Sequence, residues 1–377
     1  MIDPKSYKTL SDEITERIKD DKIILDELRQ EIRQLKTNIR RIQPRTTTSI
    51  SLVGTDGGNN KIQYDPFLVQ LIRVVDSSNN EYCLEAITPS TKMTDVHARQ
   101  FNPDGSPKTA LGKLILYLGV KSIDRLSPVF KPEATGSPKS PTWVQVYREI
   151  VEWAILFSII REKEFGTDTL IVFDGLIRSK VFSGDLFKKL REGIEEGIAK
   201  HAANRRKVYI VGFAKHSKVL ARYRLSMALE QILTNEFPAY VEISRDIEKK
   251  SYLWSEYARE DDEDGEINKY VGGKLFFVKF GSRSQDPIWP IDILISQSAD
   301  SQAIMGYLLA DALNGFPVPF YPLCLQKAHE NAALVDFDFD ILQDRIFDGI
   351  RNILGDEAKI LDAERLRDQD PSQARYS

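Results

Sequence analysis

The N-terminal part of the chain carries apolar residues at helical spacing. Over residues 8–43 they recur every three, four or seven positions, which keeps their side chains on one stripe of a helix, and charged residues fill the other faces. This pattern predicts a coiled-coil-like helix that has to bury its apolar side. We expect the helix to pair with a second copy of the chain in a homodimer; packing back onto the chain's own body is the alternative. The stripe consists of Ile18, Leu25, Leu28, Ile32, Leu35, Ile39 and Ile42.

Three strand-like runs follow this helix. The first, SISLVG, leads into the sequence TDGG, and the other two flank the polar segment DSSNN at 76–80, which is typical of a hairpin turn. The pattern therefore predicts that the sheet begins with antiparallel strands. These strands are expected over 49–54, 67–75 and 82–88.

The middle of the chain alternates between helical and strand-like patterns. Residues 142–164 are apolar almost all round from Trp153 to Ile160, which indicates a buried helix, and TLIVF at 169–173 indicates a buried strand. Such alternation predicts parallel strands covered by helices. An antiparallel meander continued by parallel strands is how a ribonuclease H-like sheet is assembled, so we expect an α/β fold with a ribonuclease H-like mixed sheet flanked by helices. Further strands are expected over 207–213, 274–280 and 288–296, and further helices over 109–119, 185–203, 217–235, 300–313, 325–335 and 340–354.

The same pattern divides the chain into three parts. Residues 1–47 form the N-terminal helical segment, and residues 48–360 form the main domain with its C-terminal helices. Residues 361–377 form a charged tail that we expect to be flexible.

Composition narrows the class of protein. The chain has 377 residues, of which 42% are hydrophobic and 29% charged, as in ordinary soluble globular proteins. It contains no run of about 18 apolar residues and no apolar signal core, so we expect a cytoplasmic protein without a membrane span. Cys83 and Cys324 stand apart from each other and from any Cys/His cluster, which predicts reduced thiols and neither a zinc site nor a disulfide.

The net charge of −4 does not by itself indicate nucleic-acid binding. The charge is uneven, however: residues 259–266 are acidic, and residues 205–207 and 215–224 are basic. A DNA-binding face can coexist with an acidic total when lysine and arginine gather on it.

Two Asp-Gly steps give the strongest local signal. They lie in VGTDGG, which contains Asp56, and in VFDGL, which contains Asp174, each after a strand-like run. A carboxylate just past a buried strand lies at the sheet edge, and the glycine after it lets a phosphate or a metal ion approach the backbone. Two such aspartates on adjacent strands could share a cation such as Mg²⁺ or Mn²⁺. Asp-Gly is also the commonest turn dipeptide, so either step alone could be structural.

The long helix over 142–164 adds a glutamate. Glu152 is its last charged residue before an apolar run, and a carboxylate at such a place is costly unless it is paired or binds a metal. Glu149, one turn earlier, is the competing candidate. An ion pair between Glu152 and Arg148 is the alternative to a metal role.

Two further residues could complete a site. His329 lies among small residues of a predicted helix, where it is either a core histidine or, beside carboxylates, a metal ligand or proton shuttle. Lys215 follows the strand expected beside that of Asp174, so its ammonium could hold a phosphate; a solvent-exposed lysine is the alternative.

Several carboxylates that converge at one site could hold the cations that phosphodiester cleavage needs. The reaction needs an activated water, a neutralised transition state and a stabilised leaving oxygen, and two hard cations about 4 Å apart meet these needs. The chain has no Walker P-loop, GxSxG or HExxH motif, so NTPase, serine-hydrolase and zincin activities have no motif here.

The order of these motifs resembles that of the NurA nucleases. VGTDGG, a helix with Arg148 and Glu152, VFDGL, VGFAKHSK and YPLCLQKAH follow one another as in that family, over roughly residues 48–335. The resemblance implies a ribonuclease H-like, Mn²⁺-dependent (or Mg²⁺-dependent) nuclease with 5′ to 3′ exonuclease and single-strand endonuclease activity. It also implies DNA as substrate and a dimer that docks on a hexameric HerA-type ATPase, in DNA end processing or defence against phage.

The resemblance also assigns roles to residues. Asp56, Glu152 and Asp174 would bind metal, His329 would complete the site and Lys215 would contact phosphate. A rival interpretation is a catalytically silent subunit that docks on the ATPase ring.

Overall fold

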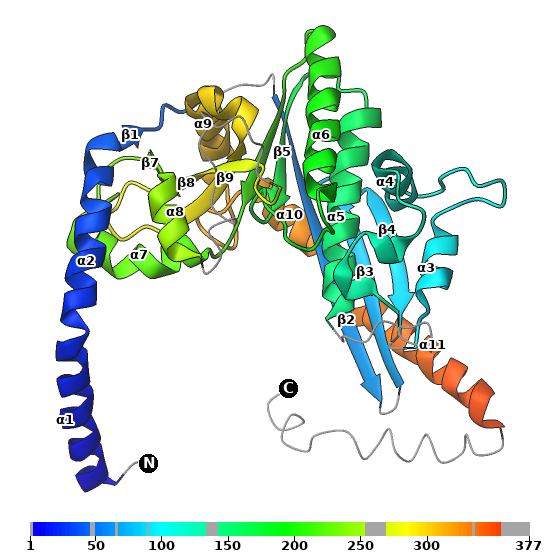
Figure 1. Ribbon diagram of the computed structural model, residues 1–377, viewed down its shortest axis with the longest axis horizontal. Helices are drawn as coiled ribbons and strands as arrows, with labels where there is room; N and C mark the ends of the chain where they lie inside the picture. Colours follow the sequence, from blue (N-terminus) through cyan, green and yellow to red (C-terminus); the bar gives the residue numbers. More distant parts are fainter. Residues whose placement is uncertain are drawn as a thin grey trace.

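The core of the molecule is a mixed β-sheet. The computed structural model describes residues 3–45, 50–64, 67–88, 90–132, 142–252, 269–333 and 336–355. Within these ranges nine strands form one sheet in the order β1-β7-β8-β9-β6-β5-β2-β3-β4 (Figure 1). The strands are β1 (Arg40–Arg41), β2 (Ile50–Tyr64), β3 (Phe67–Asp76), β4 (Glu81–Ile87), β5 (Asp168–Asp174), β6 (Val208–Phe213), β7 (Ala239–Glu242), β8 (Gly273–Lys279) and β9 (Ile288–Leu294).

The part of the sheet from β4 to β6 has the predicted topology. β2, β3 and β4 form an antiparallel meander, and β5 and β6 continue the sheet parallel to β2. β9, β8 and β7 then add antiparallel strands beyond β6. The α/β class and the meander continued by parallel strands are confirmed, while the ribonuclease H-like name stays a prediction.

Helices cover both faces of the sheet, which explains why the central strands are apolar throughout. On β5, Ile171 and Phe173 face a cluster that includes α5 and α6, while Leu170 and Val172 face the opposite cluster, formed with α9 and α10. Farther along, α2 and α7 pack over β7 and β8. The helices are α1 (Pro4–Asp20), α2 (Lys22–Arg33), α3 (Met93–Arg99), α4 (Ala110–Leu118), α5 (Trp143–Glu162), α6 (Leu186–Ala203), α7 (Lys218–Leu229), α8 (Arg245–Ser251), α9 (Ser301–Ala312), α10 (Leu323–Ala332) and α11 (Asp336–Leu354).

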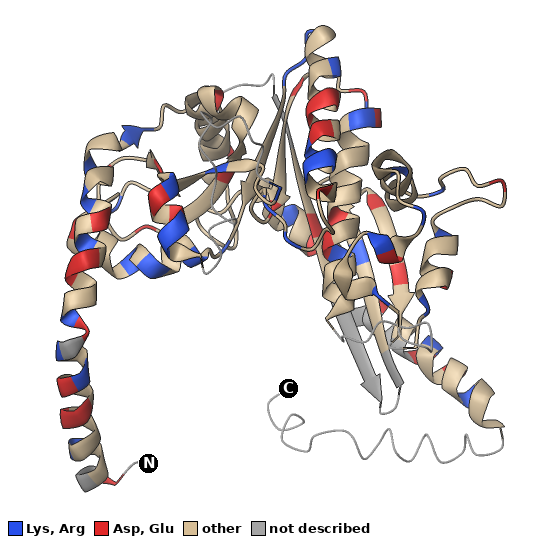
Figure 2. Ribbon diagram, in the orientation of Figure 1, with Lys and Arg blue, Asp and Glu red and all other residues tan. Residues whose placement is uncertain are grey.

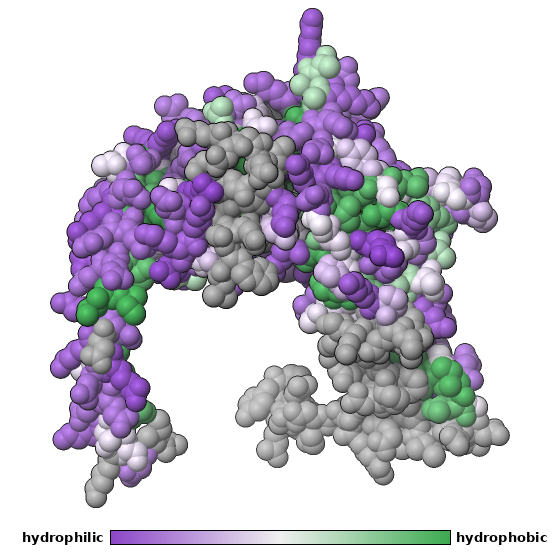
Figure 3. Space-filling model, in the orientation of Figure 1, coloured by the Kyte–Doolittle hydropathy of each residue, from purple (hydrophilic) through white to green (hydrophobic). Residues whose placement is uncertain are grey.

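The N-terminal segment is not the single helix predicted over 8–43. It divides into α1, α2 and a short 3₁₀ turn, and ends in the edge strand β1. Ile32 and Leu35 are buried against α7, so the second half of the apolar stripe packs back onto the body, as the alternative prediction held. Ile18, in contrast, is 62% exposed, and α1 extends away from the body (Figure 1). Figure 3 shows apolar surface where α1 meets α2, and the dimer contact stays a prediction.

Several boundaries differ from the sequence prediction. The helix predicted over 217–235 ends at Leu229, because Gln231 and Leu233 adopt positive φ angles that no α-helix accommodates. β7, α3 and α8 were not predicted; each is only four or seven residues long, too short for a periodic pattern to stand out.

Some predictions lie outside the described residues. These are the acidic segment at 259–266, the charged tail at 361–377 and the domain boundary after residue 47. In the part of the chain that is described, no helix is long and apolar enough to cross a membrane. Cys324 is a buried free cysteine, and Cys83 is a half-buried one.

Candidate active site

Asp56 lies inside a strand and not at its end. β2 continues through the Asp-Gly step to Tyr64, paired with β3, so the expected strand end after residue 54 is wrong. The parallel pairing of β2 with β5, however, stops at Thr55 and Phe173. Asp56 is therefore the first residue of β2 beyond that pairing, and it lies beside Asp174, the last residue of β5. The expected proximity of the two aspartates holds, because the neighbouring strand ends there.

Asp174 is a partly buried carboxylate in a crowded acidic environment. Burial, followed by the negative charge of Asp56, raises its pKa to about 6, while the ammonium of Lys215 acts in the opposite direction. Gly175 directly after it has a φ of +128°, a conformation that side chains rarely tolerate, and its N–H donates to the carbonyl of Phe213 at 2.8 Å. The glycine thus turns the chain away while Asp174 stays at the strand end.

Glu152 reaches the two aspartates from α5. Gly57 makes this approach possible, because a Cβ atom at that position would collide with the Glu152 carboxylate. The pKa of Glu152 is raised to about 8: burial is the largest cause, the positive charge of Arg148 opposes it, and the negative charges of Asp56 and Asp174 add to it. The ion pair with Arg148 is also present, with 3.2 Å between Arg148 Nε and Glu152 Oε1. The ion pair that was the alternative is therefore present, while Glu152 also lies near the two aspartates; its metal role stays a prediction.

Glu149, one turn before Glu152 on α5, has a different partner. The hydroxyl of Ser179 donates to its Oε1 at 2.5 Å. Burial raises the pKa of Glu149, and the hydrogen bond from Ser179 and the positive charges of Arg148 and Lys180 oppose this rise. Glu152, which lies against Gly57 next to Asp56, is therefore the candidate that the contacts favour.

His329 approaches from the opposite face of the sheet, on α10. Its Nδ1 lies 2.7 Å from Oδ2 of Asp56, while 62% of its side chain stays exposed. α10 can lie this close to β2 because Gly54 and Gly58 have no Cβ atoms, which would meet the carbonyl oxygens of Cys324 and Ala332. His329 is therefore not a core histidine, and the small residues that suggested one serve the contact between helix and strand.

Lys215 lies at the same place, after β6. Its Nζ is 3.9 Å from Oδ2 of Asp174 and 5.6 Å from the centre of the Tyr321 ring, and its side chain is 44% exposed. Burial and the nearby charges of Asp174 and Asp56 raise the pKa of Tyr321 above its usual range, so the ring keeps its hydroxyl proton. Lys215 thus offers a cation directly beside the carboxylates.

A cleft of about 710 Å³ opens at this site, and its lining includes Glu149, Glu152, Asp174, Arg148 and Gly175. Within the described residues, no three His, Cys, Asp or Glu side chains already stand at metal-binding distances from one another. The chemistry nevertheless fits a hard cation. The side chains offer carboxylate oxygens, and the pKa values of Glu152 and Asp174 are raised first by burial and then by the neighbouring carboxylates, so a divalent ion would stabilise their charged forms.

Sequence reasoning brought the five candidate residues to one site but missed two that arrange it, Ser179 and Tyr321. Gly57, the glycine directly after Asp56, was expected to let a phosphate or a metal ion approach the backbone; in the structure it leaves room for Glu152. Tyr321 stands at the start of the motif that contains His329. Nothing in the sequence around Ser179 indicates that it binds Glu149.

No family model matches the chain, and no curated protein matches it. Solved structures do. The NurA nuclease from Sulfolobus solfataricus has 14% identity and a TM-score of 0.45, over 94% of this chain and 99% of that one. A NurA structure with manganese has 12% identity and a TM-score of 0.43, over 91% and 98%. They come from the family that the sequence motifs resemble, but likeness at this level does not decide function, which has to come from the side chains.

Proposed function

We propose that the chain is a divalent-metal-dependent DNA nuclease and that Asp56, Glu152 and Asp174 hold the Mn²⁺ or Mg²⁺. The observation that carries the proposal is the convergence of these three carboxylates from β2, α5 and β5, with the charge of Asp56 acting on both Glu152 and Asp174, which line the cleft. Burying three acidic groups together is unfavourable unless protons or a cation offset the charge. A site that has this cost and opens to solvent is suited to bind a cation.

The side chains divide the work of phosphodiester hydrolysis. When bound, the divalent cation supplies activation of water and neutralisation of phosphate charge. His329, fixed by Asp56 and largely exposed, can accept or donate a proton at its free ring nitrogen. Lys215 can contact the scissile phosphate from beside Asp174. Each role requires only the position that the structure gives the residue.

Basic residues continue from Lys215 along α7. The helix contains Lys218, Arg222 and Arg224 and no acidic residue (Figure 2). The phosphates of a nucleic acid are the polyanion that such a series attracts. This side of the molecule therefore favours a nucleic acid over a small phosphate ester as substrate.

The test is cleavage of linear DNA labelled at either the 5′ or the 3′ end. We expect products with Mn²⁺ or Mg²⁺ and none with EDTA, and the 5′ label should be released first if the chain cuts in the 5′ to 3′ direction. Circular single-stranded DNA, which has no ends, tests the endonuclease activity. Failure to cut any of these DNAs with either metal, by protein that folds normally, would refute the proposal.

Replacing Lys215 with alanine is expected to weaken DNA binding and to lower the slope of log Kd against log salt concentration by about one. The reason is that one fewer cation releases one fewer counterion from the DNA. Binding of fluorescent DNA between low and moderate salt, with Ca²⁺ in place of Mn²⁺, measures both quantities. Lys163→Ala, an exposed lysine just past the end of α5, is the matched control. Equal slopes for wild type and Lys215→Ala would contradict the role.

The proposed partners are a second copy of the chain and a HerA-type hexameric ATPase. The exposed apolar residues of α1 are what supports a protein contact: Tyr7, Leu10, Ile14 and Ile18 are between 44% and 63% exposed.

Heat denaturation distinguishes the nuclease from the alternative of a catalytically silent subunit. A metal-binding protein is stabilised by about 2.7 kcal/mol when free metal is at 100 times the Kd. A silent subunit should show no such rise with Mn²⁺.

A further inference from the structure

The segment after Asp174 is held in place along its whole length. The N–H of Gly175 donates to the carbonyl of Phe213 at 2.8 Å, and the N–H of Ser179 donates to the carbonyl of Tyr270 at 2.9 Å. Between these points the chain passes directly over Gly212, where a Cβ atom would collide with the backbone of residues 175–177. The five residues after the carboxylate are thus a fixed connection and not a free loop.

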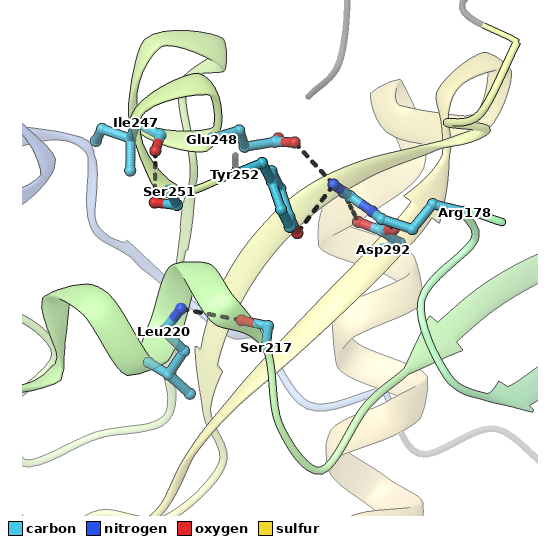
Figure 4. A network of polar contacts seen from close by, with 8 residues as sticks. All are labelled: Arg178, Ser217, Leu220, Ile247, Glu248, Ser251, Tyr252 and Asp292. Carbon is cyan, nitrogen blue, oxygen red and sulfur yellow. Dashed lines mark hydrogen bonds and ion pairs between the residues drawn. The ribbon is translucent and has the colours of Figure 1, made fainter. Parts of the chain in front are cut away.

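A buried ionic network anchors this segment through Arg178. Its guanidinium donates to both carboxylate oxygens of Asp292 on β9, at 2.6 and 2.7 Å, and to Glu248 on α8 at 2.9 Å (Figure 4). The side chains of Arg178, Asp292 and Glu248 are at most 1% exposed. Figure 4 also shows the hydroxyl of Tyr252 directed at the same guanidinium, at 3.4 Å.

A buried ionic network of this kind contributes little to the stability of the fold. Removing three charged groups from water is unfavourable, and apolar side chains of the same volume often give an equally or more stable protein. What the bidentate geometry provides is a defined position, because a planar guanidinium accepts only a narrow range of carboxylate placements. The position that it defines here is that of the chain four residues after Asp174.

We propose that Arg178 is a positioning residue that holds Asp174 in the arrangement needed for cation binding. The inference rests on the proposed function, since it concerns the same cation site. Asp174 lies at a strand end beside Asp56 and near Glu152, and repulsion among the three carboxylates would move it outward if the following segment could yield. The same segment also fixes the neighbouring glutamate, because Ser179, the next residue, binds Glu149. One anchored segment thus sets both Asp174 and the choice between Glu149 and Glu152.

The experiment compares Mn²⁺ binding by calorimetry in wild type, Arg178→Lys and Asp292→Asn. Lysine keeps the charge and loses the planar pair of bonds, and asparagine keeps the shape and loses one acceptor. Substitution of a residue that orients a metal ligand typically weakens metal affinity by about 10- to 100-fold. We therefore expect the Mn²⁺ Kd to rise at least tenfold in both variants. DNA cleavage at saturating Mn²⁺ should recover toward the wild-type rate.

Lys279→Met is the matched control. Lys279 is also a fully buried cation, on β8, but its ammonium donates to the backbone carbonyls of Asn235 and Arg283 and not to the Arg178 network. Measurements well below the melting temperature of the least stable variant separate loss of fold from loss of metal affinity. If Arg178→Lys does not fold, Asp292→Asn decides.

The outcomes separate the two proposals. Weaker Mn²⁺ binding by the two network variants, with wild-type binding by Lys279→Met, supports the positioning role. Wild-type binding by the network variants, or equal weakening in all three, overturns it and leaves the nuclease proposal standing. Absence of Mn²⁺ binding by the wild type overturns both.

Discussion

Replacing Asp56 and Asp174 together with asparagine is expected to lower metal-dependent DNA cleavage by about 10³-fold or more, which corresponds to about 4 kcal/mol in the activation free energy. Two of the three carboxylates that face one another would then carry no charge, and the remaining Glu152 could not hold a divalent cation. The same change should stabilise the metal-free protein, because the variant no longer buries two charged carboxylates, and the repulsion that adds to burial in raising the pKa values of Glu152 and Asp174 disappears. We expect a melting temperature in EDTA about 2 °C or more above that of the wild type.

Two measurements check this result: cleavage rates at several Mn²⁺ concentrations, and melting temperatures with and without Mn²⁺. Glu149→Gln is the matched control, since it neutralises a carboxylate in the same cleft that is bound to Ser179 instead of the aspartates. It should keep cleavage within about tenfold of the wild type. Cleavage by the double variant at the wild-type rate, or a Mn²⁺-dependent rise in its melting temperature equal to that of the wild type, would show that the metal binds elsewhere.

Sequence patterns were sufficient for the part of the fold whose elements are long or buried on both faces. β5 and β6 were predicted within two residues because each is a nearly continuous apolar run, and α5 because it is long and apolar almost all round in its second half. From these, the parallel strands and the position of Asp174 followed. The proximity of Lys215 also followed, since it comes directly after β6, which pairs with β5.

The rest depended on contacts that no local pattern contains. The course of β2 through Asp56 is decided by its pairing with β3, which continues for nine residues after β5 has ended. The burial of Ile32 but not Ile18 is decided by where α7 lies, although both belong to one stripe. The different partner of Glu149 is the hydroxyl of Ser179, which stands thirty positions away in the sequence.

The three glycines of β2 explain why the site can form at all. Gly54 and Gly58 leave room for α10 on one face of the sheet, and Gly57 leaves room for Glu152 on the other. Alternation along a strand sends successive residues to opposite faces, so Asp56 shares the face of α10 and meets His329 there. β2 thus contacts α10 on one face of the sheet and α5 on the other. The acidic side chains of Asp56, Glu152 and Asp174 lie near the point where β5 ends.

Without metal, the free energy of unfolding is expected to decrease as pH rises from 5 to 8, and Glu152→Gln should remove most of this decrease. The pKa of Glu152 is raised from its ordinary value of 4.5 to about 8 in the folded protein, so within this window the folded state holds a proton that the unfolded state has lost. Stability from this proton is complete below pH 4.5 and is lost as pH approaches 8. A fully buried group would give about 1.4 kcal/mol per pKa unit, and because 14% of the side chain is exposed we expect roughly 2 kcal/mol in total.

Urea denaturation in EDTA at several pH values measures this dependence. The same proton must leave before a cation binds, so Mn²⁺ affinity should increase over the same pH range, with proton release visible in calorimetry in buffers of different ionisation enthalpy. Asp174, with its pKa raised to about 6, adds a smaller decrease at the acidic end of the range, which Glu152→Gln should retain. Parallel stability curves for wild type and Glu152→Gln would mean that Glu152 carries no raised pKa, and the electrostatic case for a cation among these carboxylates would be lost.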